Sequence, residues 1–355
     1  MADLIVDYPR DIISGVQELL NACGLKSRIH SGMKVSIKPN MVLASPPSSG
    51  ATTHANVVEG LILFLKDFGI KDIEIIESSW IGDDTKRAYH VCGYDKLGKK
   101  YNIPLYDLKD DKIVKINTDE FTFEVFRKSI ETDFLINVPV LKAHCQTKMT
   151  CCLKNIKGCI SDREKRRFHA IGLHRPIAFL NKAVKTHFCL VDGICGDLTF
   201  EEGGNPVQRD MILAGSDPLT VDSYCAELIG YKPEEIEYLR IAHEIGVGRL
   251  FDVSMAVEEY NKLQKPVNES RATISGTVRR LAAHINEDRA CSSCYAALIH
   301  ALYHGRLPKD KINIGQGFRG KKGKIGCGNC TCNCEKFIPG CPPKATDIMA
   351  FLKDL

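Results

Sequence analysis

Short apolar runs alternate with stretches of helical periodicity over the first two-thirds of the chain. Five segments rich in branched apolar residues predict buried β-strands: residues 34–39, 72–78, 133–139, 188–193 and 210–215. Residues 54–69, which end at Gly69, and residues 217–230, which begin with Asp217 and Pro218, have the periodicity and the caps of helices. This alternation predicts a mostly parallel α/β sheet with helices on both faces.

The pattern changes in the last third of the chain. Residues 262–290 are polar and basic, which indicates a domain boundary or a surface helix. A helix that starts with two cysteines is predicted at 291–305, a short strand and a Gly/Lys loop at 311–326, and an amphipathic helix at 345–355. We therefore divide the chain into an α/β domain at 1–265 and a cysteine-rich region at 285–355.

The composition is that of an ordinary globular protein. The chain has 355 residues, of which 44% are hydrophobic and 26% charged, and its formal net charge of +4 gives no footprint for general nucleic-acid binding. The N-terminus carries three aspartates and lacks the basic and apolar parts of a signal peptide. No uncharged stretch approaches the roughly 20 residues that span a bilayer. We expect a cytoplasmic protein.

The sixteen cysteines are unevenly distributed, and a reducing cytoplasm argues against a disulfide framework. Five isolated cysteines are interpreted as small buried apolar residues: Cys23, Cys92, Cys189, Cys195 and Cys225. Four form a mid-chain group: Cys145, Cys151, Cys152 and Cys159. Seven lie in the last 65 residues: Cys291, Cys294, Cys327, Cys330, Cys332, Cys334 and Cys341. The last group is dense enough to hold a metal centre.

Zinc and an iron–sulfur cluster are the two alternatives for the C-terminal cysteines. Two C-x-x-C pairs, at 291–294 and 327–330, match a structural zinc site by spacing alone. A 4Fe–4S cluster needs four thiolates around a larger body, and Cys341 followed by two prolines suits one of them. We favour one such cluster, with the ligands Cys291, Cys294, Cys330 and Cys341. Cys327, Cys332 and Cys334 are alternates, or ligands of a second cluster.

A resemblance to known cluster proteins supports this choice. The stretch IPGCPPKATDI, with an upstream C-x-x-C, resembles the cluster-binding end of the complex I 20-kDa subunit and hydrogenase small-subunit families. In those families a C-x-x-C, a cysteine in a glycine-rich stretch and a G-C-P-P cysteine hold one cubane. The resemblance implies the same arrangement here.

A second group of polar residues follows the predicted strands. In α/β sheets ligands bind beyond the carboxyl ends of the strands. Lys142 and His144 come directly after such a strand, and Lys154 lies among cysteines and apolar residues, where a lysine must be paired or have a lowered pKa. We predict that these three side chains are catalytic. The predicted substrate-binding residues are Lys38, Asn40, Asn155, His169, His174 and Asp192.

The segments KVSIKPNMV, INVPVLKAHCQTKMTCCLKNIKG, LVDGI and ILAGSDPLTVDSYCAELIG resemble the family called domain of unknown function 362, over residues 34 to 230. The resemblance implies a Rossmann-like α/β fold and, as in many members, a C-terminal iron–sulfur region, but it implies no agreed reaction. The chain carries the family's signature positions: Lys38, Asn40, Lys142, His144, Thr150, Lys154, Asn155, Gly158, Asp192, Asp217 and Asp222.

A weaker likeness concerns the segment CCLKNIKGCISDREKRRFH, which is similar in layout to a lysine–glycine–histidine segment of the lactate racemase N-terminal family. In that family a lysine and histidines hold a nickel pincer nucleotide. The layout implies that Lys154 takes the lysine role, with His144, His169 or His174 as ligands.

Three functional hypotheses follow. In the first, an oxidoreductase takes single electrons from a ferredoxin-like donor through the cluster to an anionic substrate beside the catalytic lysines. In the second, a non-redox enzyme carries a structural cluster. In the third, a maturation protein hands over a metal or a cluster, and its surplus cysteines are transfer ligands. Neither a nucleic acid nor a membrane is expected as a partner, and a homodimer through residues 345–355 stays open. The chain lacks the G-x-x-x-x-G-K-[ST] phosphate loop and the G-x-S-x-G elbow.

Overall fold

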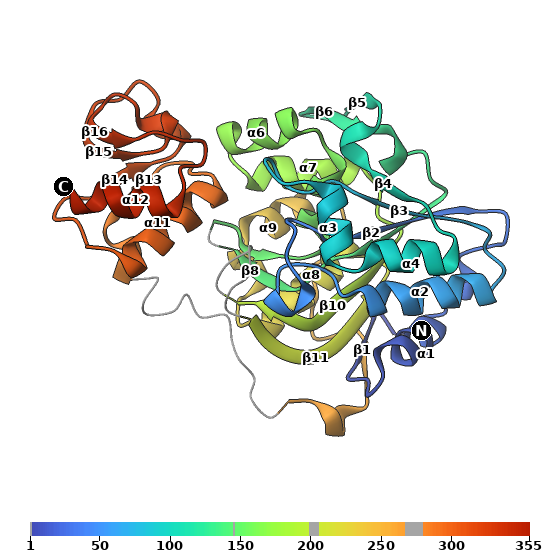
Figure 1. The fold of residues 1–355 in the computed structure, drawn as a ribbon. Helices are drawn as coiled ribbons and strands as arrows, with labels where there is room; N and C mark the ends of the chain where they lie inside the picture. The colour runs from blue at the N-terminus through green and yellow to red at the C-terminus, as the bar shows by residue number, and fades with distance from the viewer. Residues whose placement is uncertain (1, 145, 199–205, 267–279) are drawn as a thin grey trace. The chain divides into compact units, whose positions relative to one another are not determined.

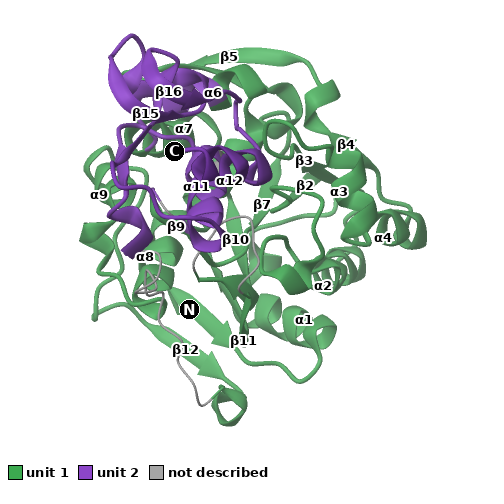
Figure 2. Cartoon of the chain, turned by 60° about the vertical axis from the view of Figure 1, so that its left-hand side comes forward, with its two compact units in different colours: residues 1–143, 147–165, 174–272 green, residues 144–146, 166–173, 273–355 purple. Residues whose placement is uncertain are grey.

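A computed structural model describes residues 2–144, 146–198, 206–266 and 280–355 of the chain. The chain divides into two compact units (Figure 2). Unit 1 comprises residues 1–143, 147–165 and 174–272, and unit 2 comprises residues 144–146, 166–173 and 273–355. Much of the polar segment 262–290, for which the sequence indicates a boundary or a surface helix, lies outside the described residues.

Unit 1 is built on an eight-stranded sheet (Figure 1). Its strands are β1 (Leu4–Asp7), β2 (Lys34–Pro39), β3 (Asp72–Glu77), β4 (Leu105–Asp107), β7 (Phe134–Val138), β10 (Phe188–Asp197), β11 (Pro206–Gly215) and β12 (Val257–Tyr260). Their order is β12-β1-β11-β10-β7-β2-β3-β4. Only β11 runs antiparallel to its two neighbours, β1 and β10. The predicted mostly parallel α/β sheet is therefore confirmed.

The helices of this part of the chain are α1 (Ile12–Ala22), α2 (Ala55–Asp67), α3 (Thr85–Val91), α4 (Tyr94–Tyr101), α5 (Cys152–Asn155), α6 (Asp162–Ile171), α7 (His174–Ala183), α8 (Pro218–Leu228) and α9 (Glu237–Glu244). Two short hairpins complete it: β5 (Ile113–Asn117) with β6 (Thr122–Phe126), and β8 (Lys142–His144) with β9 (Lys148–Thr150). As the sequence indicates, Pro218 opens α8, and the Asp217 carboxylate accepts hydrogen bonds from its first backbone N–H groups.

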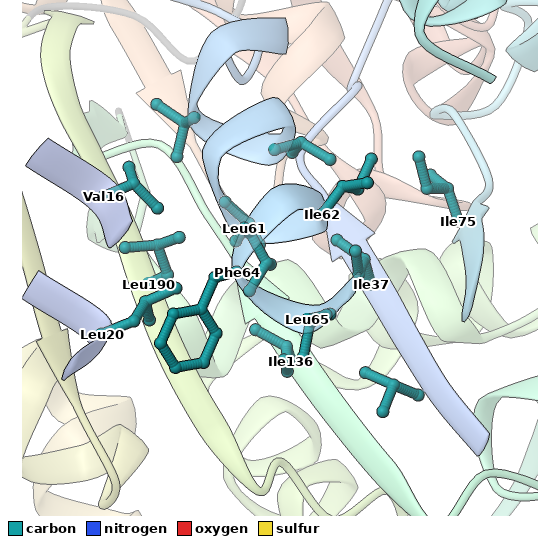
Figure 3. Close-up of a cluster of buried hydrophobic side chains, with 14 of the residues drawn as sticks. Val16, Leu20, Ile37, Leu61, Ile62, Phe64, Leu65, Ile75, Ile136 and Leu190 are labelled. Carbon is teal, nitrogen blue, oxygen red and sulfur yellow. The ribbon is translucent and has the colours of Figure 1, made fainter. Parts of the chain in front are cut away.

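Alternate residues of the central strands point to opposite faces of the sheet. On one face Ile37, Ile136 and Leu190 belong to a single hydrophobic cluster with Leu61 and Phe64 of α2 (Figure 3). The residues between them point the other way, where α5 packs on β7 and α8 packs on β10. Helices therefore cover both faces, and the face under α5 and α8 is the one that carries polar side chains.

Two strands are longer than predicted. β10 and β11 reach beyond the predicted 188–193 and 210–215 because they continue to pair with each other, as antiparallel partners, as far as Asp197 and Pro206. The outer half of β11 alternates exposed and half-buried residues, so it lacks the apolar run on which the prediction depends.

Unit 2 has a four-stranded, all-parallel sheet in the order β13-β14-β15-β16. The strands are β13 (Ile285–Glu287), β14 (Ile312–Ile314), β15 (Gly323–Cys327) and β16 (Cys334–Ile338). Two helices that pack on each other, α11 (Ser292–His304) and α12 (Ala345–Lys353), match the predicted helices at 291–305 and 345–355. Over the described residues, no helix has both the length and the apolar character that crossing a membrane requires.

Candidate functional site

A row of three buried side chains crosses the polar face of the sheet in unit 1. Lys38 of β2 lies opposite Asn137 of β7, and Asn137 lies opposite Cys189 of β10. All three are fully buried. The α5 helix covers the row, since the Asn137 side-chain amide donates to the carbonyl of Cys152 at 2.9 Å. Polar groups are thus built into the sheet near the carboxyl ends of its parallel strands, where ligands bind in such folds.

Lys38 is neutralised by a carboxylate from the neighbouring strand. Its Nζ lies 2.8 Å from Oε2 of Glu77, the last residue of β3. The same ammonium group donates to Oδ1 of Asn155 at 3.3 Å and to the carbonyl of Pro39 at 3.2 Å. A buried charge needs this pairing. The sequence does not predict Glu77 as a site residue. It lies at the end of an ordinary strand pattern, and nothing in that pattern distinguishes it from other strand residues.

Asn155 is the centre of a hydrogen-bond network. Its Oδ1 accepts from Nδ2 of Asn40 at 2.8 Å, and its Nδ2 donates to Oδ1 of Asn137 at 2.7 Å. Asn40 in turn accepts from Nζ of Lys142 at 2.9 Å. The structure thus brings together four residues that the sequence proposes one by one, Lys38, Asn40, Lys142 and Asn155.

The short helix α5 orients Lys154 and Asn155. The carboxylate of Asp222 in α8 accepts hydrogen bonds from the first two backbone N–H groups of α5, at 2.6 Å from Cys152 N and 3.0 Å from Leu153 N. Lys154 is 3% exposed, and its Nζ donates to Oγ1 of Thr150 at 2.9 Å. Because a carboxylate at a helix N-terminus fixes the first turn, Asp222 holds both side chains in place.

Gly158 has a steric role beside this network. A Cβ atom at this position would lie 2.2 Å from Oε1 of Glu77 and 2.6 Å from Nζ of Lys38. Both distances are shorter than any real contact of a Cβ atom. The Lys38–Glu77 pair can therefore take this position only because residue 158 has no side chain.

Asp192 binds a histidine that the sequence did not point to. Its Oδ2 accepts from the backbone N–H of His54 at 2.7 Å and lies 2.8 Å from Nδ1 of the same residue. Burial works against protonation of His54, but the charge of Asp192 and its hydrogen bond outweigh burial, so the pKa of His54 is raised above its ordinary value. The predicted contact of Asp192 with a substrate stays a prediction.

Lys165 is a second residue that the sequence analysis missed. It is 6% exposed, and its Nζ donates to Oγ of Ser78 at 2.9 Å and to the carbonyl of Ser79 at 2.8 Å. Burial lowers the pKa of Lys165 to about 8. The sequence gives no warning, because Lys165 lies in the charged run DREKRR and resembles a surface lysine.

The predicted histidines fall in different units. His144 and His169 group with unit 2, and His174 opens α7 in unit 1. Nδ1 of His144 accepts a hydrogen bond from the backbone N–H of Gln146 at 3.1 Å. Burial lowers the pKa of His174. Cys145, which follows His144 in the mid-chain cysteine group, lies outside the described residues. The proposed roles of the three histidines stay predictions.

The C-terminal cysteines of unit 2 lie at the start of α11, at the end of β15, at the start of β16 and in the segments that follow these two strands. Cys291 is the N-cap of α11 and Cys294 is in its first turn. A hydrogen bond with Cys291 and burial raise the pKa of the Cys294 thiol, and Cys327 and Cys341 contribute to the same shift through their charge. Cys330 is subject to the charges of Cys291 and Cys341 as well. Cys294 therefore interacts with Cys291, Cys327 and Cys341, and Cys330 interacts with Cys291 and Cys341.

Two loops that carry predicted ligands are tied together by hydrogen bonds. The backbone N–H of Gly328 donates to the carbonyl of Ile338 at 2.8 Å, and that of Asn329 donates to the carbonyl of Gly340 at 2.9 Å. The Asn329 side chain accepts from the backbone N–H of Gly340 at 2.7 Å. Cys330 and Cys341 follow directly. Cys332 is exposed, and Cys334 contacts the Asn313 side chain at 3.8 Å.

Comparisons with known proteins bear on the family of the chain. The model of the family described as Domain of unknown function (DUF362) matches residues 35–227, a segment that contains the whole network around Asn155. The Thylakoid-associated protein sll1697 of Synechocystis sp. is 22% identical over 249 residues, which cover 66% of this chain and 75% of that protein.

One solved structure is also similar, the lactate racemase apoprotein from Thermoanaerobacterium thermosaccharolyticum. It has a TM-score of 0.43 and 15% sequence identity, and the alignment covers 63% of this chain. The chain spans 57% of the length of that racemase.

Proposed function

This chain belongs to the family described as Domain of unknown function (DUF362), and we propose that it is an iron–sulfur oxidoreductase that reduces or oxidises a small anionic substrate. Unit 1 binds the substrate and unit 2 holds a 4Fe–4S cluster. One observation carries the proposal: Lys38 and Lys142 are fully buried and are joined through Asn155 and Asn40 into one network near the carboxyl ends of β2 and β7.

The cost of burying these lysines supports an anion-binding role. Removing an ammonium group from water costs several kcal/mol unless partners compensate for it. Lys38, Lys142 and Lys154 are each at most 3% exposed, within one region of unit 1. Stability alone gives no reason to gather them, because apolar residues would fill the same space. Binding of a negatively charged group does give one.

Each residue of the network then has a chemical task. The Lys142 and Lys154 ammonium groups bind the anionic group and stabilise negative charge that develops on it during reduction. Lys38 keeps its charge through Glu77 and holds Asn155, and Asn155 and Asn40 fix the direction of the Lys142 side chain. His144 is the proposed proton donor, since imidazole titrates near neutral pH.

The arrangement of four thiols in unit 2 supports the proposed cluster. Cys291 and Cys294 at the start of α11, and Cys330 and Cys341 in the two joined loops, offer four sulfurs from three chain segments. Gly328 and Gly340 have φ angles of 89° and 140°, which let the backbone turn closely around the ligand segments. When bound, such a cluster supplies single-electron transfer.

The surroundings of these thiols suit an acidic electron donor. The Cys330 thiol interacts with Arg319, which opens the basic stretch 319–324. The lysine side chains of this stretch, Lys321, Lys322 and Lys324, are exposed. Lys321 and Lys324 are paired with Asp288 and Asp310, but Arg319 and Lys322 add positive charge that would favour encounter with an acidic, ferredoxin-like protein.

Anaerobic spectroscopy with one variant and its control tests the proposal. The protein is purified without oxygen and analysed for iron and sulfide, and the reduced form is recorded by electron paramagnetic resonance. A panel of small carboxylates and phosphate esters is then added to the reduced protein. We expect one class of compound to reoxidise the wild-type protein. The control variant Lys71→Met, which changes an exposed lysine, should be reoxidised in the same way. The variant Lys154→Met should keep the spectrum of the cluster but should not be reoxidised.

Two results contradict the proposal. The first is a protein that binds no iron when iron and sulfide are supplied anaerobically. The second is a Lys154→Met variant that is folded, carries the cluster and is reoxidised at the wild-type rate by every compound that reoxidises the wild type.

A further inference from the structure

Four cysteines and one aspartate meet inside unit 1. Cys151 and Cys152 lie at the start of α5, Cys189 lies in β10, and Asp222 and Cys225 lie in α8. Each of the five side chains is fully buried. None of these cysteines has a role in the function proposed above, and in the sequence Cys189 and Cys225 resemble isolated apolar residues.

The donor atoms of this group are close together. The two sulfurs of Cys151 and Cys152 are 3.9 Å apart. One donor atom from each of Cys151, Cys152 and Asp222 lies within 4.8 Å of the other two, and no second group of three His, Cys, Asp or Glu donors meets this limit in the described ranges of the chain. The Cys225 side chain interacts with Cys151, and the Cys189 side chain interacts with Cys152.

Local structure explains why these groups meet. Asp222 and Cys225 are three residues apart in α8, so they share a face of the helix. The Asp222 carboxylate accepts the backbone N–H groups of Cys152 and Leu153, which holds the start of α5 against that face. Each carboxylate oxygen has two lone pairs, so one acceptor direction on each remains after these bonds.

The donor set indicates the kind of ion. Thiolate sulfur together with carboxylate oxygen is typical of zinc, and zinc–sulfur bonds of about 2.3 Å in a tetrahedron place two sulfurs roughly 3.8 Å apart. The separation of the Cys151 and Cys152 sulfurs is 3.9 Å. A divalent ion also compensates the negative charge of ligands that have no access to water.

We propose that Cys151, Cys152, Cys225 and Asp222 form a structural site for a zinc-class divalent ion. The site connects α5 to α8, and so fixes the helix that carries Lys154 and Asn155. All its ligands are buried, so the ion is bound as the chain folds, and its binding free energy adds to the stability of unit 1. The proposal does not depend on iron in unit 2 or on a redox reaction.

Metal analysis of the full-length protein tests this site. The protein is expressed with added zinc, dialysed against a weak chelator and analysed for zinc by mass spectrometry. We expect the double variant Cys151→Ser/Cys152→Ser to hold one equivalent less zinc than the wild type. The double variant Cys294→Ser/Cys341→Ser, which changes only unit 2, keeps that equivalent, and so does Cys159→Ser, a buried cysteine outside the group.

A second measurement covers the case in which the double variant fails to fold. Cobalt in place of zinc gives visible absorption that depends on thiolate ligands, and it is measured in the Cys294→Ser/Cys341→Ser background. We expect Asp222→Asn and Cys225→Ser each to change this spectrum, and Cys159→Ser to leave it unchanged. Zinc content that is equal in the wild type and in folded Cys151→Ser/Cys152→Ser overturns the proposal. The proposal is also overturned if the Cys294→Ser/Cys341→Ser variant binds no zinc at all.

Discussion

Lys38 and Glu77 form an ion pair in which neither side chain is more than 3% exposed. Removal of one partner leaves the other buried without compensation, which typically costs about 3–5 kcal/mol. We expect Lys38→Met to lower the free energy of unfolding by about this amount in urea denaturation. The control is Lys86→Met, which breaks an exposed pair with Asp110 and is expected to change little. An equal loss of unfolding free energy in the two variants would contradict the conclusion that burial makes the Lys38–Glu77 pair important for stability.

The absence of a side chain at Gly158 gives a second prediction. Gly158→Ala places a Cβ atom against Lys38 and Glu77, so these two buried side chains would have to shift and their ion pair would be disturbed. Overpacking of this kind costs about 1–3 kcal/mol. Gly32→Ala is the matched control, because its nearest neighbour would be 3.6 Å away, an ordinary contact. Thermal unfolding of the two variants measures the difference, and an equal melting temperature for both contradicts the steric argument.

The third prediction concerns the pKa of His54. Asp192 raises this pKa against the effect of burial, so the pair contributes stability that is fully present below the ordinary pKa of about 6.5 and is lost as the pH rises through the folded value. We expect Asp192→Asn to lower the pKa of His54, as followed by nuclear magnetic resonance of histidine-labelled protein.

His187 serves as the internal reference for this titration. Burial lowers its pKa, and Asp192→Asn should leave that pKa unchanged. The melting temperature gives a second readout, since the advantage of the wild type over His54→Gln should shrink as the pH rises. If the difference in melting temperature between the wild type and His54→Gln grows as the pH rises, the pKa of His54 is lowered in the folded protein and the prediction is wrong.

The fourth prediction separates cluster ligands from surplus cysteines. Cys341→Ala and Cys330→Ala should each reduce the iron content and the visible absorption of anaerobically reconstituted protein. Cys332→Ala should retain both, because Cys332 is exposed and its thiol contacts Asn333. Iron and sulfide analysis measures the outcome. Full iron content in Cys341→Ala would show that Cys341 is not a ligand. Loss of iron in Cys332→Ala would show that Cys332 is a ligand.

Much of the central sheet is predictable from sequence because its strands are buried on both faces. Residues 34–39 and 133–139 are predicted as strands, and they form the neighbouring strands β2 and β7. β1, Leu4–Asp7, is too short to give a periodic signal, and its place beside β11 depends on contacts distant in sequence. The two antiparallel pairs of β11 are likewise set by tertiary structure.

The candidate site was predictable where polar residues interrupt apolar surroundings. Lys142 and Lys154 stand out for this reason, whereas Glu77, His54 and Lys165 lie in segments whose composition is ordinary. A clue to the thiol group was present in α8, where Asp222 and Cys225 have helical spacing. The approach of Cys189 to Cys152 required the register of β7 and β10.

The pairing of Lys38 with Asn137 across β2 and β7 also restricts how this sheet can assemble. A shift of β7 by one residue would turn Asn137 toward Leu61 and Phe64 and would place Ile136 beside the ammonium group. Such a mispaired strand is penalised because the Asn137 amide would lose its hydrogen bonds to Asn155 and to the Cys152 carbonyl and would lie among apolar side chains. The side chains of the candidate site therefore also disfavour an incorrect register of β7 during folding.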